Sequence, residues 1–268
     1  MTQTKQMDYN VAEVAHHILW RNPGLLIELY KELLRNRTEL MIQRLGDCPI
    51  PIRIHVPIET PQSLKTLSNR LKVGEKLTVA IEKESTFHMY VYGDKTTGEE
   101  HIVIAKNLGN RKNVPVRVHS SCVTAETFHA SNCDCHEQLE KALEIIDKED
   151  FGLVIWLHQE GRGNGLAAKT QQLRIMLAEG TDTVSAFEKA GYPRDQRDYS
   201  VAADILKDLG ITSIRLITNN PDKVGQLSEL GIKVNGRISC IIAPINEIVR
   251  RDLKAKKEKL GHFFGESV

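Results

Sequence analysis

The sequence predicts an α/β protein in which a mixed β-sheet is flanked by helices, with a helical segment added at the N-terminus. From about Lys76 onward, hydrophobic residues alternate with a period of two, which is typical of strands. After Cys135, strand-like and helix-like segments follow one another in turn, which indicates an α/β sandwich with a largely mixed sheet. We therefore expect a helical N-terminal extension over residues 1–75 and a larger domain over residues 76–268.

The N-terminal segment is predicted to be helical over residues 9–46. Hydrophobic residues keep the 3.6-residue spacing of a helix over residues 11–18, and the Leu-rich run over residues 25–45 keeps it again. Four prolines, at positions 49, 51, 57 and 61, then predict a stiff and irregular connection. We place the domain boundary after this connection.

The larger domain is predicted to begin with strands and to continue as alternating helices and strands. The predicted strands cover residues 77–81, 88–92, 101–105, 114–119, 153–157, 214–218 and 232–242. The predicted helices cover residues 138–148, 165–177, 199–209 and 223–230. The basic run at residues 254–259 is predicted to be a solvated helical tail.

Composition excludes several classes of function. The formal net charge of +1 gives no general footprint for nucleic acid or for an anionic membrane, so positive charge for a phosphate-bearing ligand has to be local. The N-terminus lacks a signal-peptide pattern, and no stretch approaches the roughly 18 apolar residues that span a bilayer. We expect a cytoplasmic protein whose five cysteines are reduced thiols rather than disulfides.

Three of the five cysteines, Cys122, Cys133 and Cys135, lie within fourteen residues in the pattern C-x10-C-x-C. Thiolates at this spacing can form one face of a tetrahedral site, and soft sulfur favours zinc over magnesium or calcium. Small buried thiols are the alternative, but the closely spaced pair favours a metal. Three nearby histidines are candidates for a fourth ligand: His119, His129 and His136.

Three polar segments suit a phosphate-bearing ligand, although each also has a purely structural interpretation. Residues 158–165 form a glycine-rich turn between a strand and a helix, where free N–H groups and Arg162 can hold an anion. Asp195 and Arg197 lie two apart in a charged run that is equally typical of a solvated turn. Residues 218–223 close a strand and open a helix, as an ordinary Asn-Pro helix start also does.

Five motifs occur together in the order seen in a known family. They are RVHSSC at residues 117–122, NCDCHEQLE at 132–140, HQEGRGNGL at 158–166, DQRDYSVAADILKDLG at 195–210 and LITNNPDKV at 216–224. Over roughly residues 87–261 the chain therefore resembles the GTP cyclohydrolase II family. The first 75 or so residues are not part of the resemblance.

The resemblance implies one zinc ion held by Cys122, Cys133 and Cys135, with water as the fourth ligand. In the family this water attacks C8 of guanine, while magnesium assists at the triphosphate. A zinc-bound water has a pKa lowered towards neutrality, which suits hydrolysis of the ring to a formamide and then to formate. In the family, pyrophosphate is also released, and the product enters riboflavin biosynthesis. The resemblance also implies a homodimer.

The resemblance also implies roles for individual residues. Asp195 matches the family's general acid/base, and Arg197 matches an arginine proposed as a nucleophile at the α-phosphate. A guanidinium is a poor nucleophile, so clamping the phosphate is the easier task for Arg197. The implied nucleotide contacts are Arg117, Val118, His119, Ser120, Ser121, Gln138, Glu160, Gly161, Arg162, Thr183, Thr218 and Lys223.

Two positions depart from the family pattern. Ser121 stands where the family usually has glutamate, directly before the first cysteine, and it cannot act as a carboxylate. A tyrosine of the family is matched by Leu173 or Arg174, and neither can act as a phenolic acid. We therefore expect ring opening to survive, while deformylation or pyrophosphate release is slowed or lost.

Two other functions remain open from the sequence. A paralogue of the family could act on another nucleotide, in pyrimidine catabolism or in specialised metabolism. The added helical N-terminus and the two departures favour this interpretation somewhat. A non-catalytic zinc-stabilised protein could bind a nucleotide or act as a scaffold. The presence of all three cysteines together with Asp195 and Arg197 argues against the non-catalytic reading.

Overall fold

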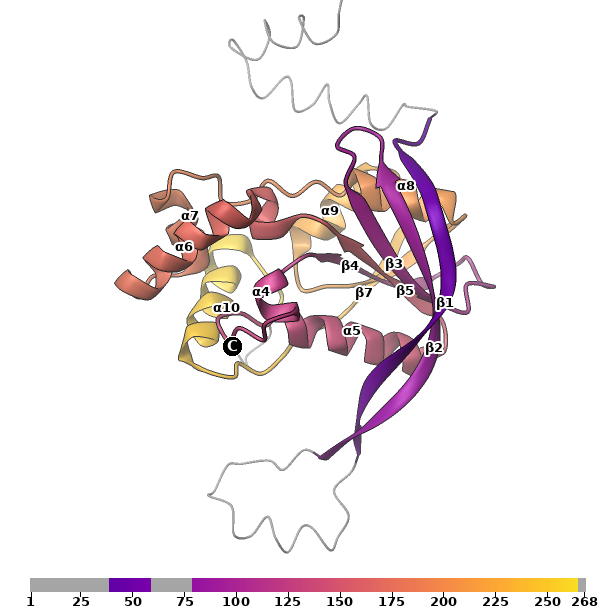
Figure 1. The fold of residues 1–268 in the computed structure, drawn as a ribbon, viewed down its shortest axis with the longest axis horizontal. Coiled ribbons are helices and arrows are strands. Elements are labelled where there is room, and N and C mark those ends of the chain that lie inside the picture. The colour runs from indigo at the N-terminus through magenta and orange to yellow at the C-terminus, as the bar shows by residue number, and fades with distance from the viewer. Residues whose placement is uncertain (1–38, 59–78, 265–268) are drawn as a thin grey trace, which may run out of the picture.

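The computed structural model of this 268-residue protein describes residues 39–58 and 79–264, which are built around one seven-stranded sheet (Figure 1). The strands are β1 (Ile42–Ile58), β2 (Val79–Asp94), β3 (Glu100–Lys106), β4 (Val114–Ser120), β5 (Gly152–Leu157), β6 (Ile214–Ile217) and β7 (Val234–Ile238). The α-helices are α4 (Val123–Glu126), α5 (Cys135–Glu149), α6 (Gly165–Glu179), α7 (Thr183–Lys189), α8 (Ser200–Asp208), α9 (Pro221–Glu229) and α10 (Glu247–Leu260), and a short 3₁₀ helix, η1, covers Glu160–Gly163.

The sheet is mixed, with the strand order β1-β2-β3-β5-β4-β6-β7. Its first half is antiparallel, because β1, β2, β3 and β5 pair in that order in alternating directions. Its second half is parallel, because β4 pairs in parallel with both β5 and β6, and β6 pairs in parallel with β7. The predicted α/β class with a mixed sheet is confirmed.

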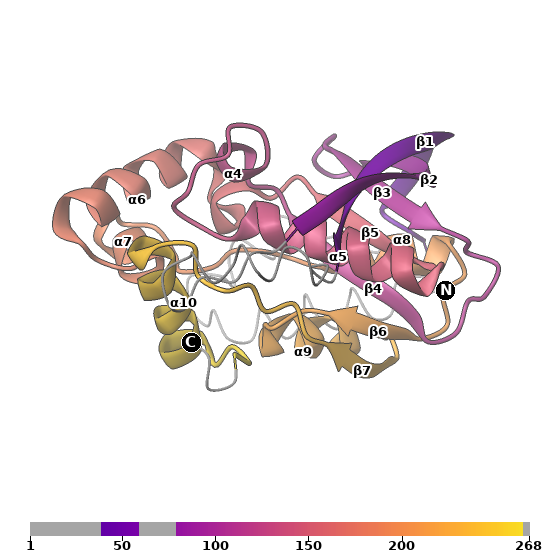
Figure 2. The same cartoon turned by 90° about the horizontal axis from the view of Figure 1, so that it is seen from below.

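Helices cover both faces of the sheet (Figure 2). One face packs against α5, where Ala142 and Ile146 meet Phe87 of β2 and Val154 of β5. The other face packs against α8 and α9 and contains most of the hydrophobic core, including the fully buried Ile205. The helices α6, α7 and α10 lie beyond the carboxyl ends of the parallel strands, on the side where α4 follows β4 (Figures 1 and 2).

The segment at residues 42–58 is a strand, so the predictions of helix up to residue 46 and of an irregular connection from residue 49 are wrong there. β1 pairs with β2 from Ile42 opposite Asp94 to Ile58 opposite Val79. Prolines are tolerated because β1 is an edge strand. The prolines at 49, 51 and 57 all occupy odd-numbered positions, so they share one side of the strand. Their nitrogens therefore point to the same, unpaired side of the strand.

Two other elements differ from the sequence prediction. The strands predicted at residues 77–81 and 88–92 are joined in one strand, β2, since no turn residue separates them. The basic run at residues 254–259 is helical as predicted and belongs to α10. Lys254 and Lys259 are exposed, but α10 is not a free tail, because its Val249 and Leu253 are fully buried. Helices predicted before residue 39 and the domain boundary after residue 75 lie outside the described residues.

No helix in the described part of the chain has the length and apolar character needed to cross a bilayer.

Candidate active site

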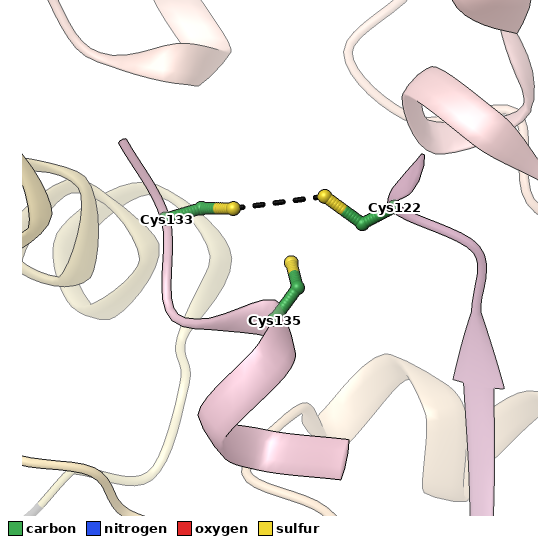
Figure 3. Close-up of side chains that lie close together, drawn as sticks. All are labelled: Cys122, Cys133 and Cys135. Atoms are coloured by element: carbon green, nitrogen blue, oxygen red, sulfur yellow. Dashed lines mark hydrogen bonds between the residues drawn. The ribbon is translucent and has the colours of Figure 1, made fainter. Parts of the chain in front are cut away.

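The three clustered cysteines come together at the carboxyl end of β4 (Figure 3). Cys122 follows β4 at the start of α4, and Cys135 is the first residue of α5. The sulfur atoms all lie within 4.8 Å of one another, and those of Cys122 and Cys133 are 3.6 Å apart. Two sulfurs at corners of a tetrahedron around zinc are about 3.8 Å apart, since Zn–S bonds measure about 2.3 Å. The three thiols therefore fit one metal ion.

The metal-ligating group among the described residues consists of the three cysteines alone. His119 is held elsewhere, because its Nε2 lies 3.0 Å from Oε1 of Glu126. His129 and His136 contact each other edge to face. Three protein ligands leave one corner for water or substrate, which is the arrangement of a catalytic rather than a structural zinc site.

A buried lysine balances the charge of the cysteine cluster. Nζ of Lys169, on α6, lies 3.0 Å from Sγ of Cys122 and 2.8 Å from Oε1 of Glu160. Hydrogen bonds from the thiols of Cys133 and Cys135, together with the charge of Lys169, lower the pKa of Cys122 despite its burial. Cys122 is thus set up as a thiolate, the form that binds a metal.

Glu126 fixes the backbone and the histidine beside Cys122. Its Oε1 accepts a hydrogen bond of 2.7 Å from the backbone N–H of Cys122, and its Oε2 accepts one of 2.7 Å from the indole of Trp156. Burial is the main reason that the pKa of His119 is lowered, and the charge of Arg117 adds to it. His119 is therefore a neutral side chain in the wall of the site.

The cysteine cluster forms part of the wall of a cavity at the carboxyl ends of the parallel strands. This is where ligands bind in open α/β sheets. Of the predicted site residues, the cavity is lined by Arg117, His119, Ser120, Ser121, Cys122, Cys133, Cys135, Gln138, Glu160, Gly161, Arg162, Thr183, Arg197, Thr218 and Lys223. The structure thus brings together residues that are spread over more than a hundred positions.

Two predicted site residues do not line the cavity. Val118 presents only its backbone carbonyl, which accepts a hydrogen bond of 2.7 Å from Nζ of Lys223. Asp195 is paired with Arg197, whose Nε donates to it at 2.8 Å and whose Nη2 forms a second, ion-paired contact. Burial raises the pKa of Asp195, but the hydrogen bonds from Arg197 lower it overall. Asp195 is an ionised carboxylate paired with Arg197.

Positive charge converges on the cavity. The cationic side chains in its wall are Arg117, Arg162, Lys169, Arg197, Lys223 and Lys256, whereas Glu160 and Asp252 are its acidic ones. Burial, followed by the charges of Arg117 and Arg197, lowers the pKa of Lys223 well below its ordinary value. Lys169, Arg197 and Lys256 are paired with carboxylates, whereas Arg117, Arg162 and Lys223 form no ion pair among the described residues. Buried cations without a counter-ion are costly, so the cavity is suited to a polyanion.

The glycine-rich turn is folded against the segment that carries Arg197. Gly163 has φ of +82°, and a Cβ atom there would lie 2.9 Å from the backbone of Gln196. The N–H of Gln196 donates to the carbonyl of Arg162 at 2.9 Å. Arg162 itself has φ of +57°, a strained conformation for a residue other than glycine, and its Nη1 is buried without a partner. Gly163 therefore serves close packing, while Arg162 faces the cavity.

Sequence reasoning missed several residues of the cavity wall. They are Asn132, Gln159, Lys169, Gln172, Phe187, Asn219, Asn220, Asp252, Lys256 and His262. Lys169 and Gln172 lie three apart on α6, a spacing that places them on one helix face. Asp252 and Lys256 lie on α10, and His262 lies two residues after its end. The pattern of Val249 and Leu253 was the signal that this helix is packed.

Of the two departures from the family pattern, one lies at the cavity and the other does not. Ser121 lines it, is 6% exposed, and has an Oγ without a partner. Leu173 is half-buried and Arg174 is exposed, and neither lines the cavity. Gln172, which is 3% exposed, faces the cavity instead.

Comparison with known proteins gives a consistent set of relatives. Residues 72–239 match the model of the family described as GTP cyclohydrolase II. The riboflavin biosynthesis protein RibBA of Endomicrobium trichonymphae is 44% identical over 177 residues, which cover 66% of this chain and 43% of that protein. RibBA of Aquifex aeolicus is 40% identical over 212 residues, covering 74% of this chain and 51% of that protein.

A plant protein, the monofunctional riboflavin biosynthesis protein RIBA 3 (chloroplastic) of Arabidopsis thaliana, is 40% identical over 199 residues, covering 73% of this chain and 39% of that protein. The chain thus spans only about two fifths to one half of the length of these relatives. A solved structure of RibBX, a two domain 3,4-dihydroxy-2-butanone 4-phosphate synthase from A. baumannii, matches 80% of this chain and 44% of that one at 17% identity and a TM-score of 0.38. The match to the family model covers well over half of the chain, and the chain belongs to the GTP cyclohydrolase II family.

Proposed function

We propose that this chain is a zinc-dependent hydrolase that opens the imidazole ring of GTP at C8 and releases formate and pyrophosphate, as in riboflavin biosynthesis. The observation that carries the proposal is the cluster of three thiols, with one corner free, in the wall of a cation-lined cavity. Relatives named as riboflavin biosynthesis proteins support the same pathway. Magnesium is proposed to accompany the triphosphate.

Zinc is the proposed metal because three thiolates and one free corner suit its tetrahedral coordination and its preference for sulfur. When bound, zinc supplies a water molecule whose pKa falls towards neutrality. Around it, Glu126 holds the backbone of Cys122, and Lys169 balances the charge of the thiolate. These contacts keep the ligands in place before a metal arrives.

The cationic residues are proposed to hold the triphosphate, with Arg197 at the α-phosphate. A phosphate bound there competes with Asp195 for the N–H donors of Arg197. Loss of these hydrogen bonds would raise the pKa of Asp195 and ready it to accept and return a proton. This assigns the general acid/base role to Asp195 and the clamp to Arg197.

A second candidate is a reaction that stops at the formamidopyrimidine. Gln172, rather than a phenol, faces the cavity from α6, and an amide has no proton to transfer at neutral pH. Ser121 carries no charge where the family usually has glutamate, which favours a paralogue acting on another nucleotide, in pyrimidine catabolism or specialised metabolism. Both alternatives predict products other than formate and a diaminopyrimidine.

The proposal is tested by incubating the zinc-loaded protein with GTP and magnesium, resolving products by mass spectrometry and assaying formate separately. Formate with a diaminopyrimidine product would establish the full reaction. A formamide product, heavier by one water than the nucleotide it came from, would establish the truncated one. Unchanged GTP would overturn both and favour another nucleotide or a binding role.

Two variants tie the activity to the site. Cys135→Ser removes one thiol of the cluster and is expected to abolish turnover together with metal retention. Asp195→Asn keeps the shape of the side chain but removes its negative charge, and a loss of about 100-fold or more in kcat is expected if it is the general acid/base. Cys48→Ser, at an exposed cysteine on β1, is the matched control and should leave turnover unchanged.

A homodimer and a cytoplasmic location are part of the proposal as well. Light scattering on the eluting protein measures the first, and a mass equal to one chain would contradict it. Fractionation of the producing cells checks the second.

A further inference from the structure

The helix α10 is anchored on two sides. On one side, Nζ of Lys259 donates to Oδ2 of Asp182, the residue that caps α7, at 2.6 Å. On the other side, the amide of Asn246 donates to the carbonyl of Ser131, in the loop that carries the cysteines, at 2.7 Å. Figures 1 and 2 show α10 beside α7. The helix therefore bridges the α6–α7 region and the cysteine loop.

A buried ion cluster lies between these two anchors. Lys256, whose side chain is 13% exposed, has its Nζ 2.7 Å from Oδ2 of Asp252 and 3.3 Å from Oδ1 of Asp134. Both carboxylate side chains are only 3% exposed. Buried carboxylates are stable only when they are paired, so Lys256 is required by both. The lysine joins α10 to the residue between the cysteines at 133 and 135.

Asp134 is held from the α5 side at the same time. Its Oδ2 accepts a hydrogen bond of 2.5 Å from Nε2 of Gln138, one turn into α5. Oε1 of Gln138 in turn accepts a hydrogen bond of 2.5 Å from Nη2 of Arg117, in the middle of β4. With Lys256 on its Oδ1, Asp134 cannot rotate without breaking charged hydrogen bonds. The peptide segment that carries two of the three thiols is thereby fixed.

We propose that Lys256 is a positioning residue for the metal site, acting through Asp134 to hold Cys133 and Cys135 where they can share one ion. The inference rests on the metal-binding part of the proposed function but not on the identity of the substrate. Hydrogen-bond partners beyond the ligands themselves commonly change metal affinity by about 10- to 100-fold when they are removed. Lys256 does not contact a metal ligand directly but acts through Asp134. We still expect a change of about 10- to 100-fold in metal affinity, because Lys256 neutralises two buried carboxylates.

The test is the zinc affinity of Lys256→Met in the full chain, measured by competition with a chromogenic chelator. We expect a loss of about 10- to 100-fold relative to the parent protein. The cobalt-substituted protein gives a second readout, since its visible absorption reports the geometry of the three sulfur ligands. The variant is expected to show an altered spectrum, whereas a change in stability alone would leave the spectrum as it is.

Asp134→Asn provides a second route in case Lys256→Met folds poorly. It keeps the volume of the side chain, and it leaves Lys256 paired with Asp252. Far-ultraviolet circular dichroism confirms folding of each variant before metal is added. If Lys256 and Asp134 act as one unit, the variant that carries both substitutions should bind zinc no more weakly than the single variant with the lower zinc affinity.

Lys254→Met is the matched control, because Lys254 is on the same helix with a side chain that is 68% exposed. It should bind zinc as the parent protein does. The proposal is overturned if folded Lys256→Met and Asp134→Asn both retain the parent's zinc affinity and cobalt spectrum. Because the readout is metal binding, a chain that binds zinc through this network but leaves GTP unchanged would refute the proposed reaction and uphold the inference.

Discussion

At the scale of single residues, Asp147 shows how a buried charge makes stability depend on pH. Its carboxylate accepts hydrogen bonds from Ser85 at 2.5 Å, from Lys106 at 2.6 Å and from Lys83 at 3.1 Å. Burial acts to raise the pKa of Asp147, but these hydrogen bonds lower it to about 2. The group binds its proton less readily in the folded chain than in the unfolded chain, where its pKa is about 3.9.

Because the folded-state pKa is depressed, the contribution of Asp147 is present above about pH 4 and is lost as the pH falls towards 2. We expect Asp147→Asn to lower the free energy of unfolding by about 2 kcal/mol at pH 7, with a smaller difference at pH 2. Urea unfolding at several pH values measures this. Asp150→Asn, at an acid that is 73% exposed, is the control, and an equal loss for Asp147→Asn at both pH values would contradict the prediction.

Much of the site can be predicted at the residue scale, because the chemistry lies in short motifs. The cysteine spacing alone indicates three thiols around one centre, and the structure brings them within 4.8 Å. Residues such as Lys256 and Gln172 could not be predicted in this way. Their place in the wall depends on how α10 and α6 pack. The pattern of Val249 and Leu253 indicates that α10 is packed, but it does not indicate which polar side chains of the helix face the cavity.

At the scale of elements, the glycine-rich turn at residues 158–165 packs directly against the segment that carries Arg197. Gly163→Ala places a methyl group against the backbone of Gln196, with no flexible side chain to yield. Gly165→Ala is a matched control, because its φ of +86° carries a similar conformational cost but nothing lies within 4 Å of the new atom. A left-handed conformation costs alanine about 1–2 kcal/mol.

We therefore expect Gly165→Ala to lose about that amount of unfolding free energy and Gly163→Ala to lose more. Gly163→Ala is also expected to lower kcat/KM, since the clash displaces Arg197. Urea unfolding and steady-state kinetics measure the two effects. Equal losses in the two variants would show that close packing at Gly163 has no separate role.

Elements with a clear hydrophobic period could be predicted from the sequence. Elements that depend on pairing with a distant strand could not. β5 and α8 agree with their predicted ranges to within a residue or two, because each buries a continuous or helically spaced hydrophobic face. β1 was missed because its prolines normally interrupt structure, and only its place at the edge of the sheet makes them acceptable. An edge position is a property of the folded sheet rather than of the segment.

At the scale of the whole molecule, the three thiols of the proposed metal site join the segment after β4 to the start of α5, which are also linked by the hydrogen bond between Arg117 and Gln138. Cys122 follows β4, Cys133 lies two residues before α5, and Cys135 is the first residue of α5. An ion held by all three binds the folded chain more tightly than the unfolded one and so stabilises it. Zinc at about 100 times its dissociation constant is expected to add about 2.7 kcal/mol to the free energy of unfolding.

Thermal unfolding of metal-depleted protein, with and without added zinc, measures this stabilisation as a rise in Tm. Cys135→Ser should remove the rise, while Cys48→Ser should keep it, since that thiol is exposed on β1. A rise of the same size in Cys135→Ser would show that zinc acts elsewhere on the chain.

The parallel unit formed by β4, α5 and β5 also has a consequence for the order in which the site is assembled. All three thiols lie within this unit, which ends at residue 157, whereas Arg197, Lys223 and Lys256 come from segments made later. During synthesis, the three thiols therefore leave the ribosome before Arg197, Lys223 and Lys256 exist. Contacts within one unit also form faster than contacts between distant segments. A nascent chain can thus begin to bind its metal through the thiols, and it gains these three cations, with the tighter metal binding proposed for Lys256, only when α10 has docked.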